Sequence, residues 1–105
     1  MITRSNNKVK TQTFFIKSLT VDAESLVSRA KSDETKAIAK KVYEAIRYSD
    51  PISNEALSSV ESQITIKFNE FSNAVIEDNK PTAKAIGNEL IILVNDRNKK
   101  CKLSK

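Results

Sequence analysis

The chain has 105 residues, with 18 Lys and Arg against 13 Asp and Glu, which gives a formal net charge of +5. It contains no His and one Cys, which excludes Ser-His-Asp and Cys-His catalytic arrangements, zinc sites built from Cys and His, and an intramolecular disulfide. A single Gly excludes Gly-rich phosphate-binding loops, and with only two Pro it leaves few turns. We therefore expect an all-α protein of long helices.

The N-terminal residues 1–10 are polar and basic, which predicts a flexible tail in front of a single domain over residues 11–105. Residues 11–19 contain Thr, Phe and Ile, which suit a strand, but Phe15 and Leu19 are four apart, which suits a helix. We expect a short helix or an apolar arm there, with a strand as the alternative. No secretory signal or membrane-spanning run is present, and the lone Cys suits a reducing compartment, so the expected location is the cytoplasm.

The next segment, residues 21–48, lacks Gly and Pro and carries two groups of apolar residues at helical spacing, around Leu26 and around Val42. Thr20 is a candidate N-cap for it. The stretch between the two groups is wholly polar, and Ser32 or Asp33 could begin a new helix there. We expect one long, bent helix, with a break near Ser32 into two helices as the alternative.

A clear helix boundary follows at residues 49–51. Asp50 is a candidate N-cap for the next helix with Pro51 at its first position, and Ser53 is an alternative cap. The apolar residues that follow are spaced by three or four and predict a helix to about Glu77: Leu57, Val60, Ile64, Phe68, Phe71 and Val75. This stripe outweighs the shorter, strand-like alternation of Ile64, Ile66 and Phe68.

The last helix is predicted from about Pro81 to Lys99 or beyond, after a second boundary at residues 78–80. Its five consecutive apolar residues, 90–94, predict the most buried stretch of the domain. Gly87 lies inside this helix and costs about 1 kcal/mol relative to Ala. Either the domain tolerates this cost, or Gly87 lets a neighbouring helix approach closely, at Phe68 or Phe71.

These elements predict an antiparallel up-down-up bundle of three long helices, or of four if the first is broken near Ser32. The polar residues around Asp50 and those around Arg97 would meet at one pole of such a bundle, or lie at opposite poles if the chain folds otherwise.

Charge is distributed unevenly, because all thirteen acidic residues lie between Asp22 and Asp96 and both ends carry only basic residues. A basic end can hold phosphates through charge alone. The candidate polyanion-binding residues are Arg97, Lys99, Lys100, Lys102 and Lys105, and Phe14 and Phe15 beside Lys17 could stack on bases. Cys101 shares this positive neighbourhood, which would favour its thiolate, but a buried and unreactive thiol is the preferred interpretation.

The favoured function is a non-enzymatic helical protein that binds another protein or itself, with no membrane partner. More apolar residues are present than three helical stripes can bury, and the candidate interface residues are Phe14, Phe15, Ile66 and Ile92. The alternative is an accessory nucleic-acid or polyanion-binding protein that uses the basic ends. We assign no catalytic residue, metal or cofactor, because the carboxylates show no spacing suited to acid–base or metal chemistry.

Overall fold

The computed structural model describes the backbone of residues 2–104 and the side chains of residues 13–103. Over this part of the chain the regular structure is helical and no strand occurs: α1 (Ile2–Arg29), α2 (Asp33–Arg47), the 3₁₀ helix η1 (Glu55–Leu57), α3 (Ser58–Ile76) and α4 (Lys80–Ser104). The all-α prediction is confirmed, and the strand alternative for residues 11–19 is wrong. The backbone of residues 2–10 belongs to α1. The side chains of the predicted basic tail lie outside the described residues, so its flexibility stays a prediction.

The helix is interrupted near Ser32, between α1 and α2. The expectation of one continuous helix over residues 21–48 is therefore wrong, and the two-helix alternative is confirmed. Ser32 caps α2, because its side chain accepts from the Thr35 backbone N–H while the Thr35 hydroxyl accepts from the Ser32 backbone N–H. The Ser32 and Thr35 hydroxyls also donate to Asp78 Oδ1, at 2.8 and 3.2 Å. This links the α1–α2 turn to the α3–α4 turn. Thr20 is no cap, since it lies inside α1 and donates to the Ile16 carbonyl.

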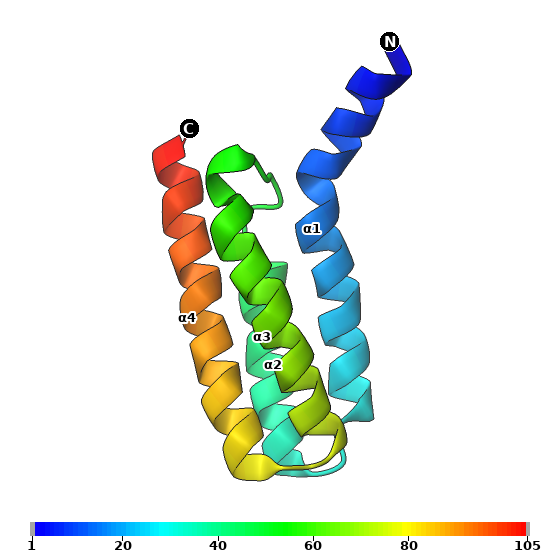
Figure 1. Ribbon diagram of the computed structural model, residues 1–105. Helices are drawn as coiled ribbons and strands as arrows, with labels where there is room; N and C mark the ends of the chain where they lie inside the picture. Colours follow the sequence, from blue (N-terminus) through cyan, green and yellow to red (C-terminus); the bar gives the residue numbers. More distant parts are fainter. Residues whose placement is uncertain (1, 105) are drawn as a thin grey trace.

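The four helices form two antiparallel hairpins, α1 with α2 and α3 with α4, as the path of the chain in Figure 1 shows. α2 packs extensively on both α1 and α4, whereas α2 and α3 lie on a diagonal and barely touch. The connection from α2 to α3 therefore crosses one end of the bundle. This places α2 beside α4, and α1 beside α3, with each of these pairs running in the same direction.

The segment that crosses the bundle end, residues 48–54, is not helical, so the predicted start of the next helix is wrong. Asp50 does not cap a helix, because its Oδ1 accepts from the Ile52 backbone N–H in a local turn. Asn54 is the cap instead, accepting from the Ala56 N–H at 2.9 Å at the start of η1. The expected helix start at Pro51 is therefore several residues too early, and Ser53 lies in the turn as well.

The core follows the predicted stripes most closely in η1 and α3. All six residues of the predicted stripe that begins at Leu57 and ends at Val75 are buried. In α4, Leu90 and Val94 are buried, but Ile92 is 59% exposed, so the apolar run of residues 90–94 is not buried throughout. Gly87 is a close-packing site, because a Cβ there would lie 2.5 Å from Ile38 Cγ1 and 2.9 Å from Phe71 Cε1. α4 thus approaches α2 as well as α3 at Gly87.

None of the helices, over the residues that the structure describes, combines the length and apolarity needed to cross a membrane.

Candidate protein-binding groove

Arg97 holds the end of the bundle where α2 connects to α3. It is 0% exposed, although it carries a charge. Its Nη1 donates to the Asp50 carbonyl at 2.7 Å, its Nη2 donates to the Ile52 carbonyl at 3.0 Å, and its Nε donates to Glu61 Oε2 at 2.9 Å. Ser53 Oγ also donates to Glu61 Oε2, at 2.7 Å. We call this set of contacts the Arg97 clamp.

The clamp has a clear physical origin. The segment that crosses the bundle end turns backbone carbonyls inwards, and buried carbonyls need hydrogen-bond donors. An Arg guanidinium supplies several donors in one plane and keeps its charge when buried beside a carboxylate. The polar residues around Asp50 and those around Arg97 therefore meet at one end of the bundle. This is the first of the two arrangements that the sequence allowed. Cys101 lies one turn further on α4, where it is buried and its thiol contacts the Ile52 carbonyl at 3.7 Å.

The burial of Arg97 removes this residue from the basic surface to which the sequence analysis assigned it, because all its charge is directed into the clamp. The side chains of Lys99, Lys100 and Lys102 are exposed at the end of α4. Lys105 lies outside the described residues.

Beside the clamp, α1 and α3 leave an open groove with a volume of about 740 Å³. On the α1 side its walls carry three apolar residues, Phe14, Phe15 and Leu19, together with Ser18 and Asp22. Phe14 is 67% exposed, whereas Leu19 is buried and Phe15 is partly buried. The Phe15 ring lies over the Arg97 guanidinium, with 5.8 Å between Cζ and the ring centroid, so the clamp supports this wall from below.

The opposite wall of the groove consists of the crossing segment and α3: Ser53, Asn54, Glu55, Glu61 and Thr65. These side chains are short or polar, so they do not reach across to cover the aromatic residues of α1. Further down the seam, polar residues of both helices surround a smaller hollow of about 240 Å³, together with Leu26 of α1 and Phe68 of α3. The groove is open because its α3 wall lacks large apolar side chains to fill it.

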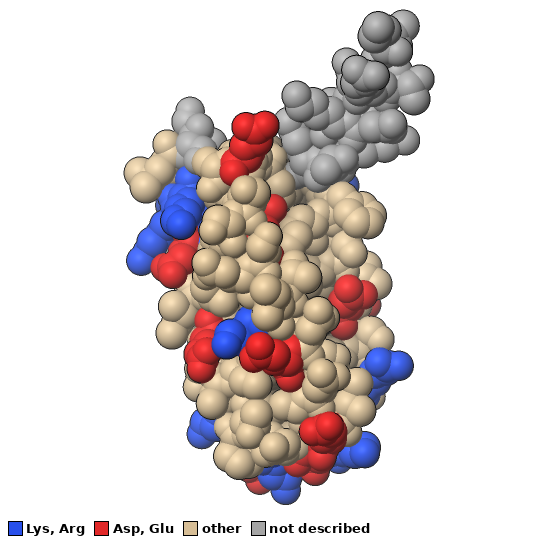
Figure 2. Space-filling model, viewed as in Figure 1, with Lys and Arg blue, Asp and Glu red and all other residues tan. Residues whose placement is uncertain are grey.

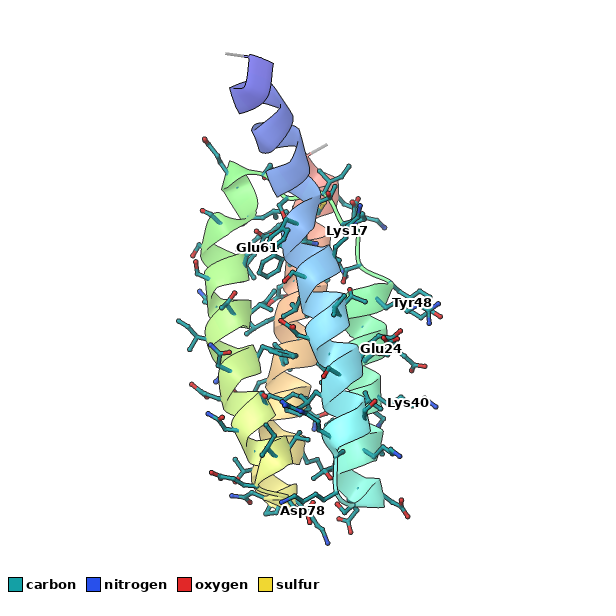
Figure 3. All side chains as sticks on the ribbon, turned by 90° about the vertical axis from the view of Figure 1, so that its right-hand side faces the viewer. Lys17, Glu24, Lys40, Tyr48, Glu61 and Asp78 are labelled. Atoms are coloured by element: carbon teal, nitrogen blue, oxygen red, sulfur yellow. The ribbon has the colours of Figure 1, made fainter. Side chains whose placement is uncertain are left out.

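The charges around the groove are acidic. In Figure 2 the surface over the upper part of the α1–α3 seam is mostly tan, with red atoms near it. Figure 3 shows Glu61 between α3 and α1, while Lys17 and Glu24 point from α1 towards the α2 side. Among the described residues that line the groove, three are acidic, Asp22, Glu55 and Glu61, and none is basic.

The other two candidate interface residues lie on a separate face. Ile66 of α3 and Ile92 of α4 are 61% and 59% exposed and line a hollow of about 390 Å³. Lys67 lies between them and pairs with Glu89 at 3.0 Å and Glu70 at 3.6 Å. The hydrogen bond that Lys67 donates to Glu89 raises the pKa of Lys67, so this lysine stays charged and offsets part of the negative charge of the two glutamates.

The structure thus separates the four predicted interface residues into two pairs, Phe14 with Phe15 and Ile66 with Ile92. Sequence reasoning found the exposed apolar residues because they lie off the helical stripes. It missed Glu61 and Ser53, whose roles depend on contacts between distant segments. The only signal for them was the pair of polar clusters around Asp50 and Arg97.

No protein-family model, curated protein or solved structure matches this chain.

Proposed function

We propose that this chain is a small non-enzymatic protein that acts by binding an apolar segment of a protein in the α1–α3 groove. The observation that supports the proposal is the exposure of Phe14, 67%, beside Phe15 and Leu19 in one open groove. An exposed aromatic side chain that continues into a partly buried apolar groove is a feature of interaction sites. The groove, with a volume of about 740 Å³, leaves room for apolar side chains of a partner.

The groove is also well suited to binding because its walls are held in place before a partner arrives. The Arg97 clamp fixes Ser53 and Glu61 on one side, and the Phe15 ring rests on the same guanidinium on the other. Fixed walls reduce the conformational entropy that is lost on binding. A groove built from mobile side chains would lack this advantage.

The test uses an uncharged probe, a peptide of Leu and Gln with Leu at helical spacing, and follows the backbone amides of the protein by NMR. We expect the amide shifts to concentrate along the groove, and Phe14→Ser to abolish them. Ile66→Ser is the matched control, because Ile66 is similarly exposed but lies on the other face. Both variants should fold, since truncating exposed side chains usually changes stability by less than about 0.5 kcal/mol. The proposal fails if Phe14→Ser leaves binding unchanged.

Self-association is a form of the same proposal, in which the apolar segment belongs to a second copy. Light scattering of the wild type and of Phe14→Ser separates this case, because a dimer formed through the groove dissociates in the variant. The cytoplasmic location predicted from the sequence is kept as part of this proposal.

The second candidate is binding of nucleic acid or another polyanion at the end of α4. The exposure of Lys99, Lys100 and Lys102 favours it, and the burial of Arg97 in the clamp weakens it. Its test is given in the Discussion, where it concerns the charge of the whole molecule.

A further inference from the structure

We infer that the partner of the groove is a basic amphipathic helix, with an apolar face that covers Phe14 and with Lys or Arg along both of its edges. This inference rests on the proposed function and adds the charge and shape of the segment that binds. The chain as a whole is basic, with a net charge of +5, so an acidic groove is a local departure from its general character.

The positions of the unpaired acids define the edges. The charge of Glu61 is matched by Arg97 at 2.9 Å. Asp22 and Glu55 form no ion pair among the described residues, and both are exposed. Asp22 belongs to the α1 wall and Glu55 to the wall at the start of η1, so one acid lies on each side of the groove. A segment that lies between them meets a carboxylate along each edge.

The shape of the groove favours a helix over an extended strand. The groove runs between α1 and α3, with the crossing segment and η1 at one end, and the described part of the chain offers no sheet edge to which a strand could add. An amphipathic helix places apolar residues on one face and charged residues on both flanks of that face. The long aliphatic stems of Lys and Arg would lie against the rims while their charges reach the acids.

The Ile66–Ile92 face does not compete for such a partner. It also exposes apolar side chains between acidic residues, but Lys67 already pairs with Glu70 and Glu89. A basic helix would have to displace this Lys to reach those carboxylates. Two unpaired acids at the groove therefore attract a cation more strongly than the two glutamates that share Lys67 at the second face, which provides an internal control.

The experiment compares two synthetic helical peptides of about 18 residues, roughly 27 Å long as a helix. Both carry Leu on one face, with Lys on the flanks of one peptide and Glu on the flanks of the other. Binding to the full chain is measured by calorimetry, and the site is located by NMR amide shifts. We expect the Lys peptide to bind in the groove at least about tenfold more tightly than the Glu peptide, and its affinity to fall with added salt.

Two matched double variants test the acids. Asp22→Asn with Glu55→Gln should weaken binding of the Lys peptide about tenfold relative to that of the Leu–Gln peptide, because only charge is removed. Glu70→Gln with Glu89→Gln removes the same charge from the second face and should change Lys-peptide affinity by less than about twofold. Unchanged circular dichroism shows that both variants fold.

Each other result overturns the inference in a distinguishable way. If both charged peptides bind in the groove with equal affinity, the proposed function stands and the basic partner is wrong. If no peptide shifts the groove amides, including the uncharged one, the proposed function fails as well. If the wild type is a dimer that Phe14→Ser dissociates, a second copy is the occupant. If the Lys peptide shifts amides around Ile66 instead, the groove is the wrong site.

Discussion

At the scale of single residues, Gly87 shows how a position that weakens a helix can be required by packing. Gly costs about 1 kcal/mol relative to Ala in a helix interior. Here the space for a methyl group is already occupied, since Ile38 Cγ1 would lie 2.5 Å from a Cβ and Ile38 Cδ1 would lie 3.0 Å from it. The clash involves the inner part of a buried side chain, which cannot turn away without disturbing the core.

We therefore expect Gly87→Ala to destabilise the protein by about 1–2 kcal/mol despite the gain in helix propensity. Urea denaturation measures this. Asn88→Ala, at the exposed neighbouring position, is the control and should be neutral or slightly stabilising. In an Ile38→Ala background the cost of Gly87→Ala should fall, because the Ile38 atoms that clash are gone while Phe71 Cε1 remains. An equal cost in both backgrounds would show that Ile38 is not the obstacle.

Asp78 is the one described non-Gly residue with a positive φ, 56°, a conformation that Asp and Asn tolerate better than other side chains. Hydrogen bonds from the Ser32 hydroxyl, and then from the Thr35 hydroxyl and the charges of Lys80 and Lys31, lower the pKa of Asp78 below its ordinary value of 3.8. Since the folded pKa is lower than the unfolded one, the ionised carboxylate stabilises the fold at neutral pH. That contribution is lost as the pH falls through the folded pKa.

Asp78→Asn tests this, because Asn keeps the positive φ and an acceptor oxygen but does not titrate. We expect the wild type to be more stable than the variant at neutral pH, and the difference to shrink as the pH falls below about 4. Urea midpoints of both proteins at several pH values measure the difference, in which the other carboxylates cancel. A difference that stays constant down to acid pH would show that the charge of Asp78 contributes nothing to stability.

At the scale of elements, the segment that crosses from α2 to α3 depends on Arg97 more than on its own sequence. Its local features are the Asp50 turn and the Asn54 cap, and neither ties it to the bundle. The hydrogen bonds of the Arg97 clamp do so, joining α4 to the crossing segment and to α3. One wall of the groove therefore has its position set by a residue more than thirty positions further along the chain.

Arg97→Lys should destabilise the protein by at least about 2 kcal/mol, because an ammonium cannot reach Glu61 and both carbonyls in the plane of a guanidinium. Hydrogen exchange should increase over residues 48–57 and remain slow in the α1–α2 hairpin. Arg47→Lys is the matched control, since Arg47 is exposed and its guanidinium lies over the rings of Tyr43 and Tyr48. If Arg97→Lys is as mild as Arg47→Lys, the clamp does not hold the crossing segment.

At the scale of the whole molecule, the question is whether the net charge of +5 serves to bind a polyanion. Residues 18–96 carry more acidic than basic residues, so the positive charge belongs to the two ends. With Arg97 buried, four Lys remain in the C-terminal segment, and they can be changed while Arg97 itself is kept. Replacing them by Gln keeps the length and the helix propensity of the segment.

We expect the variant with Lys99, Lys100, Lys102 and Lys105 changed to Gln to fold normally and keep its oligomeric state. It should lose at most weak, nonspecific DNA binding. Gel-shift titrations at several salt concentrations measure this, since each neutralised phosphate contributes a slope of about −0.9 on duplex DNA. The groove would not be the main binding site if the wild type binds nucleic acid tightly at physiological salt and the folded variant does not.

How far the sequence predicts this protein differs from one feature to another. The six-residue stripe of α3 and the break near residues 78–80 were predicted because helical periodicity and Pro act locally. The break at Ser32 stayed one of two alternatives, because a cap of that strength competes with continuation of the helix. In the structure the cap residue also donates to Asp78, which lies 46 residues away in the chain and which helical periodicity cannot reveal.

The sequence by itself determined that the chain is helical, which faces of α3 and α4 are apolar, and that apolar residues remain uncovered, because these properties follow from composition and spacing. Only the tertiary structure decided which helices are neighbours, since α2 packs beside α4 and the connection to α3 crosses the bundle end. That arrangement buried Arg97, which looks like one more basic residue of the C-terminus in the sequence. It also placed the polar residues Glu61 and Thr65 of α3 opposite the aromatic residues of α1, which left the groove beside Phe14 open.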